Sequence, residues 1–203
     1  MKSELFSRNV PGSLEVLQRA TVAVAGCGGL GSNAAVALVR SGVGRLILAD
    51  FDRVAKSNLN RQHYFLEDVG KTKVTALAAH LRRINPGVNL TLHPVKLTPA
   101  NIHQFFAAAD ILIEAFDRGE SKIWLVESWS RQYPDRPVIV GSGLSGIGHT
   151  GELRVEKSGR IFVCGDQKNG EERGLSAARV GLVAHMQANT ALALLINPEG
   201  ESI

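Results

Sequence analysis

The chain has 203 residues, of which 44% are hydrophobic and 21% charged, and its formal net charge is +4. This length fits one domain, and the composition excludes a disordered chain. The cysteines, Cys27 and Cys164, lie far apart, which excludes a disulfide framework and a zinc site of the Cys-x-x-Cys type.

The charges are scattered along the chain. The densest basic pair is Arg82-Arg83, and no basic run alternates with aromatic residues. Nucleic-acid binding needs a clustered electrostatic footprint, so the pattern argues against it, whereas a small polyanionic ligand would suit this excess of charge. No apolar run approaches the roughly 20 residues of a membrane span, and residues 1–17 lack the apolar centre of a signal peptide. We therefore expect a cytoplasmic protein without a membrane partner.

From about residue 20 the pattern alternates strand and helix. Residues 21–26 (TVAVAG) and 45–50 (RLILAD) are continuous apolar runs, as in strands buried on both faces, and residues 31–43 between them are typical of a helix. These three segments predict a βαβ unit. The elements expected after it are a helix over 71–84, a strand over 89–97, a helix beginning at 98–99, a strand over 111–116, a helix over 121–129 that buries Ile123, Val126 and Trp129, a strand over 138–140, a hairpin of strands 152–156 and 160–164, and a helix over 177–196.

This order predicts an α/β fold. We expect a Rossmann-like open sheet, mainly parallel in its N-terminal part, with an appended antiparallel hairpin and helices on both faces. Residues 1–203 would form a single domain. Its parts would be an N-terminal arm (1–20), a nucleotide-binding part (21–140), and a hairpin, loop and closing helix (141–203).

A glycine motif stands between the first strand and helix. Residues 26–31 (GCGGLG) satisfy G-x-G-x-x-G, and Asp50 ends the next strand 24 positions after Gly26. Glycines permit a tight turn and let the backbone approach a phosphate, while an acidic residue at that distance can accept hydrogen bonds from ribose hydroxyls. The motif indicates an adenine nucleotide without separating NAD from ATP, and a glycine turn needed only for packing is the alternative.

The connection over residues 51–70 favours a triphosphate. About twenty residues without clear periodicity are usually functional in a compact domain. The segment carries Asp52, Ser57, Asn58, Arg61 and Gln62. An NAD-binding fold needs no arginine here, whereas a triphosphate brings several negative charges that an arginine can neutralise.

At these residues the chain resembles the ThiF/MoeB/HesA family, the bacterial relatives of ubiquitin-activating enzymes. The resemblance covers about residues 8 to 117, and the tail is similar to the short ThiF branch, which adenylates the sulfur carrier ThiS of thiazole synthesis for thiamine. The matching segments are 26–31 (GCGGLG), 50–52 (DFD), Val54, 57–62 (SNLNRQ), Lys73 and Asp117, followed in the tail by 163–166 (VCGD), 178–181 (ARVG) and 187–189 (QAN).

The resemblance implies an adenylyltransferase that uses ATP and Mg²⁺. A carboxylate, the C-terminal glycine of a small ubiquitin-like sulfur carrier ending in Gly-Gly, would attack the α-phosphate and release pyrophosphate. The implied nucleotide contacts are Gly28, Gly29, Gly31, Asp50 at the ribose, Asp52, Ser57, Asn58, Arg61 and Lys73, and the implied catalytic residues are Arg61, Lys73, Asp117 as the magnesium ligand, and Arg8. A homodimer is implied as well, with Arg8 reaching the partner subunit's site.

Each implied role has a structural alternative. Lys73 could be a solvated lysine at a helix start, Asp117 a helix cap, Arg61 the partner of Glu67 or Asp68, and Asp52 a solvated loop charge. The chain also departs from the family. It lacks the two Cys-x-x-Cys pairs of many relatives, so we expect no zinc. Arg118 follows Asp117 where relatives often have asparagine, and a role for the Cys164 thiol in sulfur or acyl transfer stays open.

Other functions remain compatible with the sequence. They are a related adenylating enzyme for a molybdopterin-type carrier or a modified tRNA, an NAD-dependent oxidoreductase, and a non-catalytic nucleotide-binding subunit. The glycine-rich residues 141–151 would admit the carrier tail. The main hypothesis requires Arg61, Lys73 and Asp117 to converge beside Gly28–Gly31.

Overall fold

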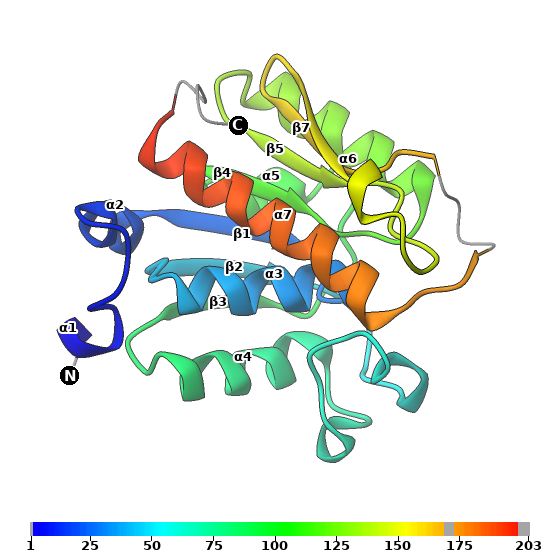
Figure 1. The fold of residues 1–203 in the computed structure, drawn as a ribbon, viewed down its shortest axis with the longest axis horizontal. Coiled ribbons are helices and arrows are strands. Elements are labelled where there is room, and N and C mark those ends of the chain that lie inside the picture. The colour runs from blue at the N-terminus through cyan, green and yellow to red at the C-terminus, as the bar shows by residue number, and fades with distance from the viewer. Residues whose placement is uncertain (1, 169–172, 199–203) are drawn as a thin grey trace.

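The computed structural model describes residues 2–168 and 173–198. Within these residues the strands form a seven-stranded sheet of order β3-β2-β1-β4-β5-β7-β6 (Figure 1). Every neighbouring pair is parallel except β6 and β7, which form an antiparallel hairpin. The expected fold class is confirmed. The strands are β1 Thr21–Ala25, β2 Arg45–Ala49, β3 Asn89–His93, β4 Ile111–Glu114, β5 Val138–Gly141, β6 Arg154–Ser158 and β7 Ile161–Gly165.

Helices cover both faces of the sheet (Figure 1). The helices α3, α4 and α7 contribute to one hydrophobic cluster, and α5 and α6 to the other. Alternate residues of β1 divide between them, since Val22 and Val24 join the first cluster and Ala23 and Ala25 the second. The helices are α1 Lys2–Leu5, α2 Ser13–Arg19, α3 Gly29–Arg40, α4 Lys73–Ile84, α5 Ile102–Phe106, α6 Gly119–Gln132 and α7 Ala177–Ile196, with short 3₁₀ turns η1 Lys56–Asn58, η2 Leu66–Asp68 and η3 Thr150–Glu152.

The order in which successive strands are added to the sheet reverses at β1. The chain steps outward from β1 to β2 and β3, then crosses back to place β4 on the other side of β1. In such a sheet, ligands bind beyond the carboxyl ends of the strands at this crossing point. The topology therefore brings the ends of β1, β2 and β4 together at one edge.

Some predicted boundaries and contacts were wrong. The helix expected to begin at residues 98–99 begins at Ile102, because residues 98–101 form a turn in which the side chain of Asn101 accepts a hydrogen bond from the Thr98 N–H. In α6 the side chain of Ile123 is 61% exposed, whereas Leu125 and Trp129 are buried. The prediction that Trp129 is buried is confirmed, whereas the prediction that Ile123 is buried is wrong. No described helix combines the length and apolarity that a membrane crossing requires.

Candidate nucleotide-binding site

The turn between β1 and α3 is built so that only glycine fits at two positions. Gly26 has a φ of 96°, and a Cβ there would lie 2.8 Å from the carbonyl oxygen of Ala115. A Cβ on Gly31 would overlap the carbonyl oxygen of Gly26. Gly31 therefore serves the close approach of helix and turn, which the sequence alone did not distinguish from nucleotide contact.

The helix that leaves this turn presents uncapped backbone N–H groups. Gly28 occupies the N-cap position of α3 without a capping side chain, and the first turn contains no acidic residue. The first N–H groups of a helix lack intrahelical acceptors and carry the positive end of the helix dipole. Beside them, a Cβ on Gly28 would lie 3.7 Å from Gln62 Nε2, and the buried Gln62 Oε1 has no hydrogen-bond partner among the described residues. These groups suit an anionic ligand with hydrogen-bonding atoms.

Asp50 supports the glycine turn from the end of β2. One carboxylate oxygen accepts the Cys27 N–H at 2.6 Å, and the other accepts the Asp52 N–H at 2.8 Å. Burial raises the pKa of Asp50, although Lys73 and these two N–H groups oppose the rise. The structure thus assigns Asp50 a bracing role, and its contact with a ribose stays a prediction.

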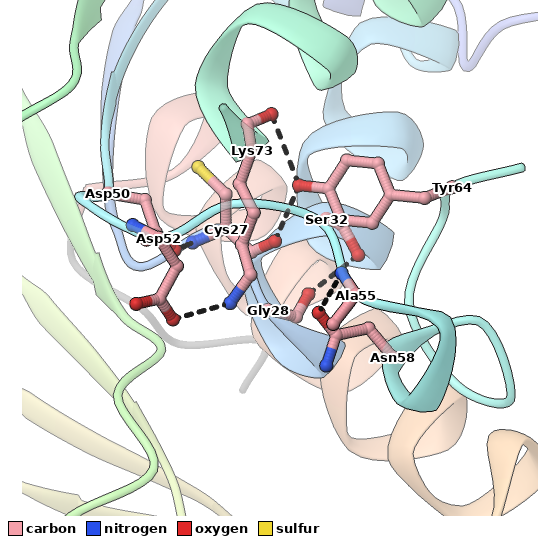
Figure 2. Close-up of polar contacts among 9 residues, drawn as sticks. All are labelled: Cys27, Gly28, Ser32, Asp50, Asp52, Ala55, Asn58, Tyr64 and Lys73. Atoms are coloured by element: carbon pink, nitrogen blue, oxygen red, sulfur yellow. Dashed lines mark hydrogen bonds and ion pairs between the residues drawn. The ribbon is translucent and has the colours of Figure 1, made fainter. Parts of the chain in front are cut away.

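Lys73 is buried and points at Asp52. Its Nζ lies 2.7 Å from Asp52 Oδ2, and the side chain of Lys73 is 8% exposed against 48% for Asp52 (Figure 2). The Lys73 N–H also donates to the Asp52 carbonyl at 2.9 Å. The alternative of a solvated lysine at a helix start is therefore wrong, and Asp52 is a paired carboxylate rather than a free loop charge.

Arg61 lies against the same turn. Its Cγ would be 3.7 Å from a Cβ on Gly29, and its guanidinium donates to the carbonyl of Ser57 at 3.1 Å and to Asn60 at 2.8 Å. Asn58 supports this segment by accepting the Ala55 N–H at 3.0 Å (Figure 2).

The expected alternative partners of Arg61 do not hold it. Asp68 pairs instead with Lys71 at 3.0 Å and with His80 at 2.9 Å. No ion pair of Arg61 occurs in the part of the chain that the structure describes. Its charge is therefore available to a ligand.

Asp117 follows β4 at the same edge and is exposed. The preceding residue, Phe116, places its ring 3.4 Å from the position of a Gly26 Cβ. The N-cap of α6 is Arg118, without a capping side chain, so the alternative of Asp117 as a cap is wrong. The three elements that carry Arg61, Lys73 and Asp117 thus all border the glycine turn.

Arg8 lies elsewhere in the chain. It is exposed, and the next residue, Asn9, donates to the carbonyl of Ser41 at 2.8 Å, beyond the carboxyl end of α3. The 12 residues of α3 span about 18 Å. Within one chain, Arg8 is therefore remote from the glycine turn.

Tyr64 is a site residue that the sequence analysis missed. Its buried hydroxyl donates to the Cys27 carbonyl at 2.7 Å and also approaches the Lys73 carbonyl at 3.3 Å (Figure 2). It joins the connection, the glycine turn and α4. An aromatic residue within a polar connection was its only sequence signal.

A second missed group joins the ends of β4 and β5. Glu114 is fully buried, and Lys122 Nζ lies 2.8 Å from its carboxylate and 3.0 Å from the Gly141 carbonyl. Gln187 Nε2 donates to the Glu114 carbonyl at 2.8 Å, while Gln187 Oε1 is buried without a partner among the described residues. Burial raises the pKa of Glu114 despite the opposing effect of Lys122.

Both thiols are buried. Burial, then the neighbouring Asp50, raises the pKa of Cys27. Burial also raises the pKa of Cys164 to about 11, with a small opposing effect from Thr190. Because the thiolate is the reactive form, neither environment activates a nucleophile.

The fold and this edge define an α/β protein with a Rossmann-like open sheet and a glycine turn at the end of its first strand. The model of the ThiF family matches residues 4–203, and the chain belongs to that family. The family recognition made from the glycine turn and the residues after it is confirmed.

The related proteins carry several activities. The chain is 41% identical over 144 residues to the tRNA threonylcarbamoyladenosine dehydratase of Bacillus subtilis, covering 68% of this chain and 56% of that protein. It is 41% identical over 108 residues to a sulfur carrier protein adenylyltransferase of Thermus thermophilus, covering 53% of this chain and 40% of that protein. The chain thus spans about half the length of the curated relatives it matches.

Solved structures agree with the fold. A crystal structure of the Escherichia coli tRNA N6-threonylcarbamoyladenosine dehydratase TcdA has a TM-score of 0.88 at 22% identity, covering 98% of this chain and 97% of that one. A crystal structure of the same enzyme in complex with ATP has a TM-score of 0.85 at 22% identity, covering 99% and 94%.

Proposed function

We propose that this chain adenylates a carboxylate with ATP as the second substrate. A carboxylate oxygen attacks the α-phosphorus, the bond from that phosphorus to the bridging oxygen breaks, and pyrophosphate leaves. The product is an acyl-adenylate. The proposal is supported by the glycine turn with its uncapped helix start, against which Arg61 packs, together with the buried Lys73 held by Asp52.

Charge neutralisation is the main task of such a site. Two unit charges at about 4 Å repel by about 4 kcal/mol at an effective dielectric near 20. Arg61 offers a guanidinium without a carboxylate partner in the described chain, and Lys73 has three donors of which Asp52 takes one. Preorganised donors of this kind stabilise developing charge without a general base.

Asp117 would hold Mg²⁺. Magnesium is commonly bound by one or two carboxylates together with substrate phosphates. An exposed carboxylate at the end of β4 fits that mode, and the described residues contain no cluster of three or more His, Cys, Asp or Glu side chains suited to a metal. When bound, the ion would neutralise phosphate charge.

The acceptor we propose is the C-terminal glycine of a small ubiquitin-like sulfur carrier of the ThiS type, acting in the cytoplasm in thiazole synthesis for thiamine. The Thermus thermophilus relative is a sulfur carrier protein adenylyltransferase. After β5 the chain contains Gly143, Gly146 and Gly148, all with positive φ. Gln187 Oε1, which has no hydrogen-bond partner among the residues that the structure describes, lies beside Gly141. A tail without side chains suits a path along such a glycine-rich segment.

A modified tRNA is the second candidate acceptor. The Bacillus subtilis relative, matched over 68% of this chain, is a tRNA threonylcarbamoyladenosine dehydratase. A threonylcarbamoyl group also carries a carboxylate, so the same activation chemistry would apply. The scattered charge of the chain favours the protein carrier.

Carrier-dependent exchange of labelled pyrophosphate into ATP tests the proposal. We expect exchange with a carrier ending in Gly-Gly and Mg²⁺, a mass gain of one AMP on that carrier, and no exchange with the same carrier lacking its two last residues. Exchange with threonylcarbamoyladenosine-containing tRNA alone would select the second acceptor. Absence of exchange with every carboxylate offered would refute adenylation.

We also propose a homodimer. Arg8 is too far from its own glycine turn to act there, so a catalytic role would need the partner subunit. Mixing inactive Arg8→Ala and Lys73→Met chains tests this arrangement, since a shared site would regain activity in the mixed dimer. No regain in a demonstrated dimer would exclude a role for Arg8 across the interface.

A further inference from the structure

A cavity of about 360 Å³ is lined by residues that do not belong to the glycine turn. We name it the α3–α4 cavity, because its lining residues belong to the end of α3, to α4 and to the connection between β2 and α4. Figure 1 labels both helices. Its volume is in the range of small-molecule sites, which hold about 300–1,000 Å³. Its lining residues are Arg40, His63, Phe65, His80, Arg83 and Ile84.

The lining is rich in cations and donors. Arg40 and Arg83 are permanently charged and exposed, and the lining contains no carboxylate among the described residues. Arg82, the neighbour of Arg83, is not part of the lining. Two guanidinium groups in one lining suit an oxyanion, to which arginine donates hydrogen bonds in pairs.

Three aromatic rings of the lining pack against one another. The Phe65 and His80 ring centroids are 5.0 Å apart, and those of His63 and His80 are 6.0 Å apart. His80 is held from behind, with Nδ1 facing the His63 carbonyl at 3.2 Å and Nε2 2.9 Å from Asp68. The buried Asp68 also pairs with Lys71, so this carboxylate already has two partners.

The cavity is separated from the glycine turn by the backbone of the connection. The Arg61 carbonyl accepts from Asn33 at 3.0 Å, and the His63 N–H donates to Ser32 Oγ at 3.0 Å. Arg61 lies against Gly29 on one side of this stretch of backbone, whereas His63 lines the cavity. A ligand in the cavity would therefore not occupy the nucleotide site.

We propose that the α3–α4 cavity binds a phosphate group, either as inorganic phosphate or as a small phosphate monoester. The two arginines supply the charge, and the aromatic rings accommodate a short organic group. This inference does not depend on the adenylation activity.

A protonation change should accompany binding. Burial, then the charges of His80 and Arg40, lowers the pKa of His63, so this ring is neutral near neutral pH. Arg83 also faces the cavity, and the paired Asp68 and Lys71 lie behind His80. A bound dianion opposes the effect of the cations and should raise the pKa of His63. Binding of the dianion should therefore be accompanied by proton uptake at His63.

Histidine imidazole NMR spectra of the full chain test the proposal. Inorganic phosphate or ribose 5-phosphate is added without ATP, with chloride holding the ionic strength constant, and His63 is assigned from a His63→Asn variant. We expect saturable shifts of the His63 and His80 signals. Arg40→Ser and Arg83→Ser should each weaken binding at least about tenfold, while Arg82→Ser, a matched control, should leave it unchanged.

The outcomes separate this site from others. Tighter binding of ribose 5-phosphate assigns an ester and equal binding assigns the free anion, and both support a phosphate site. The Lys73→Met variant should keep the phosphate-induced shift of the His63 signal, because Lys73 belongs to the nucleotide site. Loss of this shift in the variant would place the phosphate at the glycine turn and overturn the proposal. It would also be overturned by unsaturable shifts, by equal weakening in Arg82→Ser, or by a response to an RNA oligonucleotide alone.

Discussion

Replacing Lys73 with methionine isolates its charge from its packing. Methionine retains most of the apolar volume of the buried stem, and such volume-conserving changes usually cost less than about 1.5 kcal/mol. The partner, Asp52, has a side chain that is 48% exposed and can return to water when the ammonium group is lost. We therefore expect the free energy of unfolding to fall by less than about 1.5 kcal/mol.

The effect on catalysis should be much larger. A cation about 4 Å from a phosphate charge contributes about 4 kcal/mol at an effective dielectric near 20. Asp52, at 2.7 Å, takes up part of this charge, so about 3 to 4 kcal/mol is a reasonable range for the loss. Because about 1.4 kcal/mol corresponds to a tenfold change in rate, kcat/KM should fall about 10²- to 10³-fold.

Carrier-dependent pyrophosphate exchange and urea unfolding measure the two effects on the same preparation. Lys71→Met is the matched control, since it removes the same charge two positions away, where Lys71 is 52% exposed and Asp68 retains His80 as a partner. The control should keep its exchange rate within about threefold of the native chain. Equal exchange rates in the two variants, or a loss of several kcal/mol of stability in Lys73→Met alone, would show that Lys73 is structural.

Gly31→Ala should destabilise the chain by about 3 kcal/mol or more in thermal unfolding, because the added methyl overlaps the backbone of Gly26; native stability would contradict the close approach. Tyr64→Phe should cost about 1–3 kcal/mol, since it strands a buried carbonyl of the glycine turn, and should raise the KM for ATP; an unchanged KM would limit its role to folding. Lys122→Met should cost about 3–5 kcal/mol near pH 8, because it leaves Glu114 buried and unpaired. The pKa of Glu114 is already raised in the folded chain, so its contribution to stability is fully present below its unfolded pKa and is lost as pH rises through the folded pKa. The cost of Lys122→Met should therefore be smaller at about pH 5 than at about pH 8. A cost that does not change with pH in urea unfolding would refute this.

Much of the fold could be predicted because its signals are local. The helix over residues 177–196 was predicted with both boundaries as observed, and the βαβ unit around the glycine turn was displaced by only a few residues. Hydrophobic runs and glycine motifs can be recognised from a short stretch of sequence, without knowing which distant residues it contacts. Ile123 shows the limit, because the side of α6 that packs on the sheet depends on how the helix is rotated against β4 and β5.

The residue types for a nucleotide site were present in the sequence: a glycine motif after the first strand, an acidic residue after the second strand, and a long connection with an arginine. Only the tertiary structure decided how these charges are used. In the fold, Lys73 is buried against Asp52 and Asp68 contacts His80, while Arg61 has no carboxylate partner among the described residues. Ion pairing and burial depend on which distant segments meet across a fold, and no spacing along a single chain contains that information.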